Sequence, residues 1–293
     1  MRMVGGLLLV LLSLSACAPA ADSSGSAVVR DMVVGNKVRT HILYVPKAVA
    51  PKPALVLLLH GRGGNGAEIR ERTRRSFETL ADAWGFIVAY PDSLRGHWND
   101  GHPWATADAD DVEYLAALVA QLIAENHVDG RRVFVTGFSN GAGMAYRLAC
   151  DRPDLVAAVA PVSGGLAQSR MQPCAAASKR PIPLLVIHGT DDPVNPFDDG
   201  ELEGNVQYWI RRNGCALQPA MSYLPQAEPA GSRTRVERWE HCAAPVTLYA
   251  LEGCGHHWPD GDEPFRWHPQ GPTCRTFDGA QAIWDFFGSV PVG

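Results

Sequence analysis

The sequence predicts an α/β fold, in which a mostly parallel sheet is covered by helices on both faces. Residues 54–59 form a continuous apolar run, typical of a strand buried on both faces, and further short, mainly apolar runs at residues 86–90, 132–136, 184–187 and 246–249 also predict strands. Segments of helical character alternate with these runs, as in βαβ units. The chain has 293 residues, of which 46% are hydrophobic, so it can bury the core of one such domain.

The first seventeen residues predict an export signal rather than a part of the fold. Arg2 gives a short positive region, and residues 4–14 form an apolar run that is too short to span a bilayer comfortably. The segment is therefore expected to be processed during export.

Two processing routes are open. Residues 14–17 (LSAC) are typical of a bacterial lipoprotein signal, in which Cys17 becomes the acylated N-terminus. Residues 18–20 (APA) instead allow cleavage after residue 20 and release of a soluble protein. We favour lipidation because the apolar run ends directly before the LSAC tetrad. Both routes predict an exported protein, which is either secreted or anchored as a periplasmic or cell-surface lipoprotein.

The rest of the chain is predicted to be a linker followed by one domain. Residues 18–26 are small and polar and predict the linker, and the domain is expected at residues 27–293. An early antiparallel strand is expected at residues 37–45. Helices are expected at residues 69–84, 111–125, 142–149 and 280–287. Asp111 is the expected N-cap of the second helix.

The charge pattern argues against nucleic acid as a partner. The net charge of −5 comes from 26 basic and 31 acidic residues, which are scattered without long like-charged runs. Such a surface neutralises phosphates poorly. No attachment to a membrane is expected other than a lipid on Cys17.

The cysteines predict a disulfide framework. Either processing route removes Cys17 from the seven cysteines, and an even set in an exported chain predicts disulfides. The predicted pairs are Cys150–Cys174, Cys215–Cys242 and Cys254–Cys274. The first pair flanks one strand–helix segment, the second brackets an irregular excursion without a core of its own, and the third closes a histidine-containing loop. The spacings do not fit zinc, so neither a metal nor a cofactor is expected.

The strongest functional motif is GFSNG at residues 137–141. It has the form G-x-S-x-G and stands between a predicted buried strand and a predicted helix, where a nucleophilic serine sits on a tight turn. Small neighbours are needed there because the backbone bends sharply and the helix packs close behind. The helix N-terminus also favours developing negative charge. Ser139 is therefore the predicted nucleophile.

A second motif, HGRGG at residues 60–64, directly follows another predicted buried strand. It resembles the H-G-x-G loops that donate a backbone N–H to an oxyanion hole. The predicted donors are the N–H of Arg62 and the N–H of Asn140, the residue after the nucleophile. One such donor is worth about 3 kcal/mol in a protease. His60 itself is expected to fix the loop rather than to take part in the chemistry.

A serine hydroxyl needs a base that is oriented by an acid. In the α/β-hydrolase order, the acid and then the base follow the serine along the chain, on loops after strands. Residues 188–193 (HGTDDP) follow the next predicted strand, and four aspartates near this loop are candidates for the acid: Asp191, Asp192, Asp198 and Asp199. Residues 253–259 (GCGHHWP) follow the strand after that and offer His256 or His257 as the base.

Four ordered segments resemble the polyhydroxybutyrate depolymerase family: LHG at 59–61, GFSNGAG at 137–143, HGTDDPVNP at 188–196 and GCGHHWP at 253–259. That family also includes feruloyl esterases, acetylxylan esterases and lipoprotein esterases of bacteria. The resemblance covers nearly all of the mature chain. It implies an α/β-hydrolase fold and a serine esterase without a cofactor, but it does not imply one substrate.

The resemblance also assigns the acid and the base. Carried over by position, the family's H-G-T-x-D-P pattern implies Asp192 as the acid, and its G-x-G-H-x-W-P pattern implies His256 as the base. The chain has Cys254 where glycine is frequent and Asn195 where an apolar residue is frequent, and neither departure removes a catalytic group. The implied reaction is attack of Ser139 on an ester carbonyl, followed by hydrolysis of the acyl-enzyme.

The loop between the strand at 86–90 and the helix at 111–125 is the predicted substrate wall, and the family has a Trp-containing loop there. Trp98 and Trp104 are expected either to stack on a phenolic ring, a sugar or a polyester chain, or to pack as ordinary structural aromatics.

Three other functions fit parts of the pattern. A serine peptidase or an acyltransferase would use the same three residues, and a non-catalytic surface lipoprotein would bind a polysaccharide or a partner without them. Ester hydrolysis is favoured by the resemblance and by the presence of all three residues.

Overall fold

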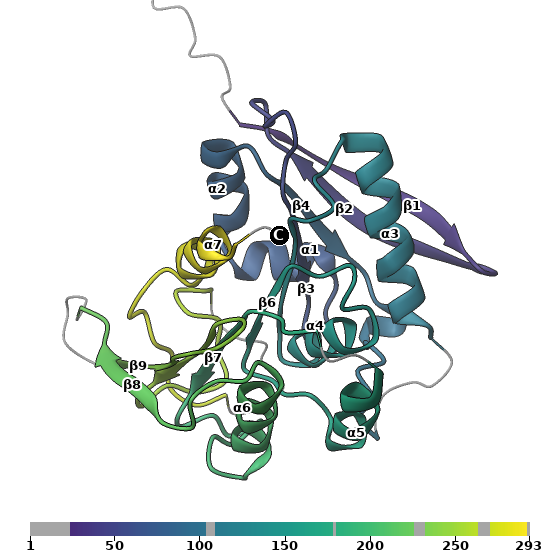
Figure 1. Ribbon diagram of the computed structural model, residues 1–293. Helices are drawn as coiled ribbons and strands as arrows, with labels where there is room; N and C mark the ends of the chain where they lie inside the picture. Colours follow the sequence, from purple (N-terminus) through teal and green to yellow (C-terminus); the bar gives the residue numbers. More distant parts are fainter. Residues whose placement is uncertain (1–23, 104–108, 178–179, 226–231, 263–269, 292–293) are drawn as a thin grey trace, which may run out of the picture.

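The computed structural model describes residues 24–103, 109–177, 180–225, 232–262 and 270–291 (Figure 1). The predicted export signal with Cys17, most of the predicted linker, and Trp104 lie outside these residues. Within the described ranges, no helix is both long enough and apolar enough to cross a bilayer.

One sheet organises the described part of the chain. Its strands lie in the order β1-β2-β4-β3-β5-β6-β7-β10-β9-β8. Neighbours from β4 to β10 in this order are parallel, while β1 and β2 at one edge and β8 and β9 at the other are antiparallel. This confirms the predicted mostly parallel sheet. The bounds are β1 (Ser26–Val34), β2 (Lys37–Val45), β3 (Leu55–Leu59), β4 (Ile87–Pro91), β5 (Val133–Phe138), β6 (Ala158–Val162), β7 (Leu184–Gly189), β8 (Pro219–Tyr223), β9 (Thr234–Trp239) and β10 (Val246–Leu251).

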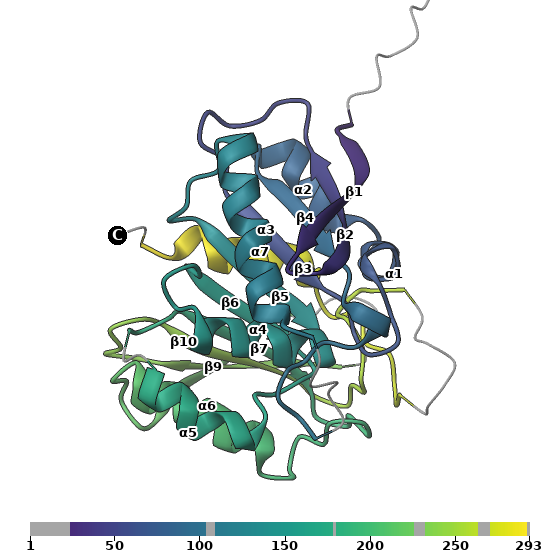
Figure 2. The same ribbon diagram turned by 90° about the vertical axis from the view of Figure 1, so that its right-hand side faces the viewer.

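Helices cover both faces of the sheet (Figures 1 and 2). Helices α3, α4 and α6 pack on one face, where α5 lies between α4 and α6, and α1, α2 and α7 pack on the other. The bounds are α1 (Gly66–Arg72), α2 (Ser76–Trp84), α3 (Asp111–Asn126), α4 (Asn140–Asp151), α5 (Gln168–Ala177), α6 (Glu201–Arg212) and α7 (Gly279–Ser289), with a short 3-10 turn at Leu94–Gly96.

The sheet separates two hydrophobic cores, one on each face, which explains why β3 is continuously apolar. In β3, Leu55, Leu57 and Leu59 belong to the core under α3 and α4, whereas Val56 and Leu58 belong to the core under α1 and α2. Because successive side chains of a strand point to opposite faces, a strand covered on both faces needs apolar residues at every position.

The helix predicted at 69–84 is two helices. The chain breaks between α1 and α2, where Arg74 and Arg75 have positive φ of 54° and 55°. The break serves a tertiary contact, since Arg74 forms ion pairs with Asp260 and Asp262, and the Asp262 N–H donates to the carbonyl of Arg72 over 2.9 Å. A helical pattern in the sequence gives no sign of such a partner.

Two further predictions are corrected. The strand that follows Ser139 is β6, which the sequence did not predict, and β7 comes after it. Pro161 lies within β6, and proline lowers the strand propensity of so short a run. The N-cap of α3 is Asp110, whose side chain accepts from the Glu113 N–H, and not the predicted Asp111.

The three predicted disulfides are confirmed. The structure joins Cys150 to Cys174, Cys215 to Cys242, and Cys254 to Cys274. Each bridge closes a loop of between 20 and 27 residues. Bridges of this length typically stabilise a domain by about 2–4 kcal/mol.

A buried ion pair ties α3 to the edge of the sheet. The Arg39 guanidinium on β2 donates to the Asp111 carboxylate over 2.6 Å, and both side chains are almost fully buried. The second oxygen of Asp111 accepts from the Asn99 N–H over 2.7 Å, and Arg39 also lies over the Tyr114 ring. The pair therefore holds the loop at Asn99 as well as the helix.

Asp111→Asn should lower the free energy of unfolding by about 3–5 kcal/mol, because it leaves the Arg39 charge buried without its counter-charge. Asp110→Asn is the matched control, since asparagine caps helices as well as aspartate does and should change stability by less than about 0.5 kcal/mol. Urea unfolding measures both variants. Equal losses in the two variants would contradict the role given to the buried pair.

Candidate active site

Ser139 lies on a strained turn between β5 and α4. Its φ of 56° and ψ of −118° are rare for a residue with a side chain. Its N–H donates to the carbonyl of Val162 over 2.9 Å, which ties the turn to the end of β6. A strained turn from a strand into a helix is the backbone conformation that presents a nucleophilic serine.

Glycines permit this turn because there is no room for a side chain. A Cβ on Gly141 would lie 2.3 Å from the carbonyl oxygen of Leu59 and 2.5 Å from that of His60. A Cβ on Gly137 would lie 2.6 Å from the carbonyl carbon of Gly141. The start of α4 therefore rests directly on the backbone at the end of β3.

Asp192 and His256 form a buried hydrogen-bonded pair. His256 Nδ1 lies 2.7 Å from Asp192 Oδ2, and the other carboxylate oxygen accepts from the N–H groups of Val194 and Asn195, each over 2.8 Å. Burial, the largest influence, raises the pKa of Asp192, but the hydrogen bond and charge of His256 together with the Asn195 N–H hold that pKa below its usual value. An ionised Asp192 accepts the proton on Nδ1, so Nε2 is the nitrogen left as a base.

The geometry distinguishes the candidate acids and bases that are neighbours in the sequence. Of the four candidate aspartates, Asp192 is the one whose carboxylate reaches His256, while Asp191 is exposed and accepts from its neighbour Thr190. His257 donates instead to the carbonyl of Gly271 over 3.0 Å. These contacts agree with the assignment that the family resemblance implied.

A covalent bridge and a backbone hydrogen bond hold the loop of His256. The His256 N–H donates to the carbonyl of Gln270 over 2.6 Å, and the Cys254–Cys274 disulfide joins the same two segments. The His256 ring also lies 4.8 Å from the Phe138 ring, centroid to centroid, beside the nucleophile turn. The position of the imidazole is therefore set by its own loop and by the Phe138 ring.

The two predicted oxyanion donors lie next to the turn. Asn140 is the first residue of α4, so its N–H has no acceptor within the helix. Arg62 follows Gly61, where a Cβ would lie 3.2 Å from the Phe138 ring and 3.6 Å from the Cβ of Ser139. The loop that carries Arg62 thus packs against the serine.

His60 has a structural position. Its Nε2 accepts from the Ser93 N–H over 3.0 Å, so the proton is on Nδ1, which lies 2.7 Å from the carbonyl oxygen of Gly61. Burial is the main cause that lowers the pKa of His60 to about 4. A neutral, doubly hydrogen-bonded imidazole fixes the loop and is unsuited to proton transfer.

The substrate role considered for Trp98 is corrected. Its side chain is 0% exposed, its Nε1 donates to the carbonyl of His60 over 2.9 Å, and its backbone N–H donates to the Asn140 side chain over 2.8 Å. A ring with no exposed face cannot stack on a substrate, so Trp98 packs the loop against the turn, which was the second role considered for it.

A cavity of about 260 Å³ lies beside Ser139. Its walls are mostly polar or glycine, and Val194 is the one apolar side chain among the described lining residues. The described lining residues are Arg62, Asp100, His102, Ser139, Asn140, Gly164, Gly165, Val194, Asn195 and Glu201. A larger hollow of about 530 Å³ between α7 and β10 contains none of these residues.

An imidazole between two carboxylates forms one wall of the cavity. His102 Nδ1 lies 3.0 Å from Asp100 Oδ2, and His102 Nε2 lies 3.2 Å from Glu201 Oε1. Burial alone would lower the pKa of His102, but the hydrogen bonds to Asp100 and Glu201 outweigh it and raise that pKa to about 9. His102 is therefore an imidazolium at neutral pH. This group was not predicted from the sequence, since nothing in the spacing brings Glu201 to a loop 99 residues earlier.

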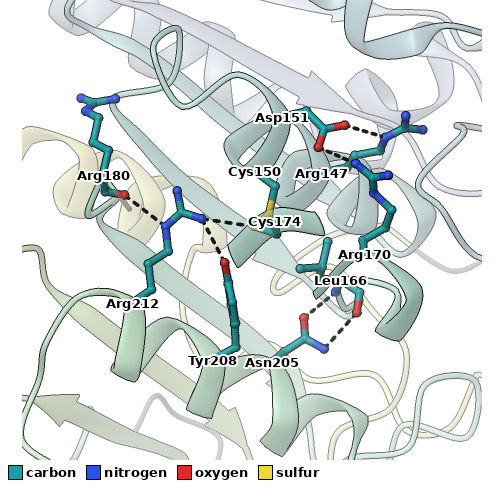
Figure 3. Close-up of a disulfide and its surroundings, with 10 residues drawn as sticks. All are labelled: Arg147, Cys150, Asp151, Leu166, Arg170, Cys174, Arg180, Asn205, Tyr208 and Arg212. Atoms are coloured by element: carbon teal, nitrogen blue, oxygen red, sulfur yellow. Dashed lines mark hydrogen bonds and ion pairs between the residues drawn. A yellow bond between two sulfur atoms is a disulfide. The ribbon is translucent and has the colours of Figure 1, made fainter. Parts of the chain in front are cut away.

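The back wall of the cavity is held by α6 (Figure 3). Gly164 and Gly165 line the cavity, and the next residue, Leu166, is bound through both its N–H and its carbonyl by the fully buried side chain of Asn205. The N–H bond is 2.6 Å long and the carbonyl bond 3.2 Å. This bidentate contact fixes the loop after β6 to the helix that carries Glu201.

The neighbouring helix α5 is fixed to α4. Figure 3 shows the Cys150–Cys174 disulfide between them, and beside it Asp151 accepts from both Arg147 and Arg170. A disulfide and ion pairs thus hold α5 to α4, the helix that begins at the cavity. Within the described part of the chain, no group of three or more His, Cys, Asp or Glu side chains could hold a metal ion.

Known proteins are similar to this chain in sequence and in fold. Residues 39–179 match the family model described as esterase PHB depolymerase. The chain is 35% identical to feruloyl esterase C of Emericella nidulans, over 74% of this chain and 76% of that protein. It is 28% identical to the bifunctional acetylxylan esterase/xylanase XynS20E of Neocallimastix patriciarum, over 83% of this chain and 32% of that protein.

A solved structure has the same architecture. The acetyl xylan esterase from Aspergillus awamori superposes with a TM-score of 0.67 at 20% identity and covers 89% of this chain and 99% of its own. Together with the identity to the feruloyl esterase, these matches show that the chain belongs to the esterase PHB depolymerase family and is a carboxylic ester hydrolase of the α/β-hydrolase fold.

Proposed function

We propose that this protein is an exported serine esterase in which Ser139, His256 and Asp192 form a catalytic triad that works through an acyl-enzyme. The observation that carries the proposal is the 2.7 Å contact between His256 Nδ1 and Asp192, next to a serine on a strained strand-to-helix turn. Nucleophile, acid and base also follow one another along the chain in the order of this fold.

The proposed reaction has two halves. His256 Nε2 takes the proton of Ser139 as its Oγ bonds to the ester carbonyl carbon, and the N–H groups of Arg62 and Asn140 stabilise the oxyanion. When the carbon–oxygen bond to the alcohol breaks, His256 returns the proton to the leaving oxygen. A water molecule activated by His256 then hydrolyses the acyl-enzyme, and Asp192 stabilises the imidazolium throughout.

The proposed substrates are esters of plant polysaccharide or polyester oligomers. Relatives are named feruloyl esterase and acetylxylan esterase, and the family model is named for polyhydroxybutyrate depolymerases. Parallel assays on methyl ferulate, acetylated xylan and hydroxybutyrate oligomers would rank these three classes. No cofactor or metal takes part in the proposed reaction.

Export is proposed on separate grounds. Three disulfides are typical of an oxidising compartment outside the cytoplasm. The N-terminal segment favours a lipid anchor on Cys17 as well. Mass spectrometry of the N-terminal peptide from the native host would test for this lipid. An unmodified peptide that begins after residue 20 would favour secretion instead.

Three alternatives predict different products. A peptidase would cleave peptides, and an acyltransferase would form an acylated product only when an acceptor sugar is added. A non-catalytic binding protein would not react with a fluorophosphonate probe. Turnover of 4-nitrophenyl acetate with labelling by the probe, and without peptide cleavage or dependence on an acceptor, is the result that we expect.

Ser139→Ala should lower kcat by about 10⁴-fold or more and abolish labelling by a fluorophosphonate, because the nucleophile is gone and only binding and the oxyanion hole remain. The melting temperature should change little, since Ala, like Ser, carries a Cβ and leaves the strain of this turn as it is. A variant that kept more than a few per cent of wild-type kcat, with contamination excluded, would overturn the assignment of the nucleophile.

Asp192→Asn should lower kcat by about 10³–10⁴-fold, because the amide presents the wrong group to His256 Nδ1. Asp191→Asn is the matched control and should stay within about twofold of the wild type, since Asp191 is exposed and contacts Thr190. Steady-state kinetics on 4-nitrophenyl acetate measures both. Equal losses, or the reverse order, would move the acid role to Asp191.

Removal of the Cys254–Cys274 bridge by alanine at both positions should lower kcat about tenfold as well as stability. The bridge joins the segment of His256 to the segment that accepts its N–H, so its loss lets the base move. Removal of Cys215–Cys242 is the matched control, which should cost about 2–4 kcal/mol of stability and leave kcat unchanged. A similar kcat in both double variants, measured where both are folded, would refute this positioning role.

A further inference from the structure

One wall of the cavity beside Ser139 contains the carboxylate of Glu201, which His102 holds in place. Glu201 is the first residue of α6, and its side chain is 42% exposed, which leaves it open to the cavity. One of its oxygens accepts from His102 Nε2, and a carboxylate can accept several further hydrogen bonds. Glu201 is therefore a fixed acceptor with capacity left over.

A chain of ion pairs and hydrogen bonds runs from Glu201 back to the nucleophile turn. His102 bridges Glu201 to Asp100, and Asp100 accepts from the Asn140 side chain over 2.6 Å. Asp100 is 1% exposed, and it fits against α4 because Gly143 has no side chain: a Cβ there would lie 2.7 Å from the Asp100 carboxylate. The position of Glu201 is thus set relative to the residue that follows Ser139.

Glu201 also lies close to the back wall. A Cβ on Gly165 would lie 3.1 Å from its Oε1 atom, and its backbone carbonyl accepts from the Asn205 side chain over 2.8 Å. The Asp199 side chain accepts from the Glu201 N–H over 2.8 Å. These contacts order a residue that would otherwise be a mobile side chain at a helix end.

The cavity lies on the acyl side of the proposed nucleophile. In a tetrahedral intermediate on Ser139, the oxyanion faces the N–H groups of Arg62 and Asn140, and the leaving oxygen faces His256, which must protonate it. His256 is not among the described residues that line the cavity, whereas Ser139, Arg62 and Asn140 are. The acyl chain is the remaining substituent, so it is the half of the ester that enters the cavity.

We propose that Glu201 is a specificity-determining residue that accepts a hydrogen bond from a hydroxyl group on the acyl half of the ester, with His102 and Asp100 as positioning residues. The favoured substrates are esters of hydroxy acids, and esters of unsubstituted acids of similar size are disfavoured. An unsubstituted chain would displace water from Glu201 without replacing the hydrogen bonds of that water, and this loss lowers affinity. The inference rests on the proposed function of Ser139, His256 and Asp192.

Two matched pairs of esters test the proposal. The acyl pair is 4-nitrophenyl 3-hydroxybutyrate and 4-nitrophenyl butyrate, which differ by one hydroxyl in the acid. The alcohol pair is 2-hydroxyethyl butyrate and ethyl butyrate, which differ by one hydroxyl in the alcohol. The wild type should favour the hydroxylated acyl ester by about tenfold in kcat/KM, as one hydrogen bond to a charged group allows, and should barely distinguish the alcohol pair.

Glu201→Ala should bring the acyl ratio close to one, because kcat/KM for the hydroxylated ester should fall about tenfold more than kcat/KM for 4-nitrophenyl butyrate. Glu203→Ala is the matched control, because Glu203 is an exposed glutamate on the same helix and does not line this cavity within the described residues. It should keep the wild-type ratio. His102→Gln should raise KM for the hydroxylated acyl ester more than KM for 4-nitrophenyl butyrate, which a general loss of structure would not do.

The outcomes separate this inference from the proposed function. Two results would overturn the inference: an unchanged acyl ratio in Glu201→Ala, or a wild-type preference within the alcohol pair that Glu201→Ala removes. In either case an inactive Ser139→Ala variant would still support the proposed triad. An active Ser139→Ala variant would overturn the proposed function first. Circular dichroism of each variant checks that the fold is intact.

Discussion

The site depends on one backbone contact, the close approach of the start of α4 to the end of β3. The carbonyl oxygens of Leu59 and His60 lie where a side chain on Gly141 would have to be. Because β3 and β5 are neighbours in the sheet, with Leu59 opposite Gly137, this contact brings the loop after β3 beside the turn after β5. The N–H groups proposed for the oxyanion hole, from different loops, can converge only because α4 starts so close to that loop.

Each loop at this edge of the sheet is then held by a different device. The loop after β3 is fixed by the neutral His60, the loop after β7 by two backbone N–H groups that bind Asp192, and the loop after β10 by the Cys254–Cys274 bridge. Parallel strands supply the common edge, but they do not fix the loops. Groups that must stay within hydrogen-bond reach of one another need such local supports.

The sequence predicted what depends on local pattern and missed what depends on distant contacts. Strands β3, β5, β7 and β10 are covered on both faces, so each is rich in apolar residues, whereas β1 and β8 at the sheet edges are largely exposed and lack that signal. Asp191 and Asp192 are adjacent and chemically identical, so spacing could not choose between them, although the family resemblance could. Burial of Trp98 and the meeting of His102 with Glu201 arise from packing between segments far apart in the chain.

Burial and nearby carboxylates act in opposite directions on the pKa of a histidine. His60 faces no carboxylate, and His188 lies 3.5 Å from Asp192 with its Nε2 on the carbonyl oxygen of Asn195, but burial lowers the pKa of both. His102 faces two, so its pKa rises from an ordinary 6.5 to about 9. A neutral His188 does not compete with His256 for the charge of Asp192. Because the pKa of His102 is about 9, its imidazole stays charged through neutral pH, and this wall of the cavity keeps one charge state there. A change of pH near neutrality therefore leaves the charge of this wall, and the hydrogen bond that His102 donates to Glu201, as they are.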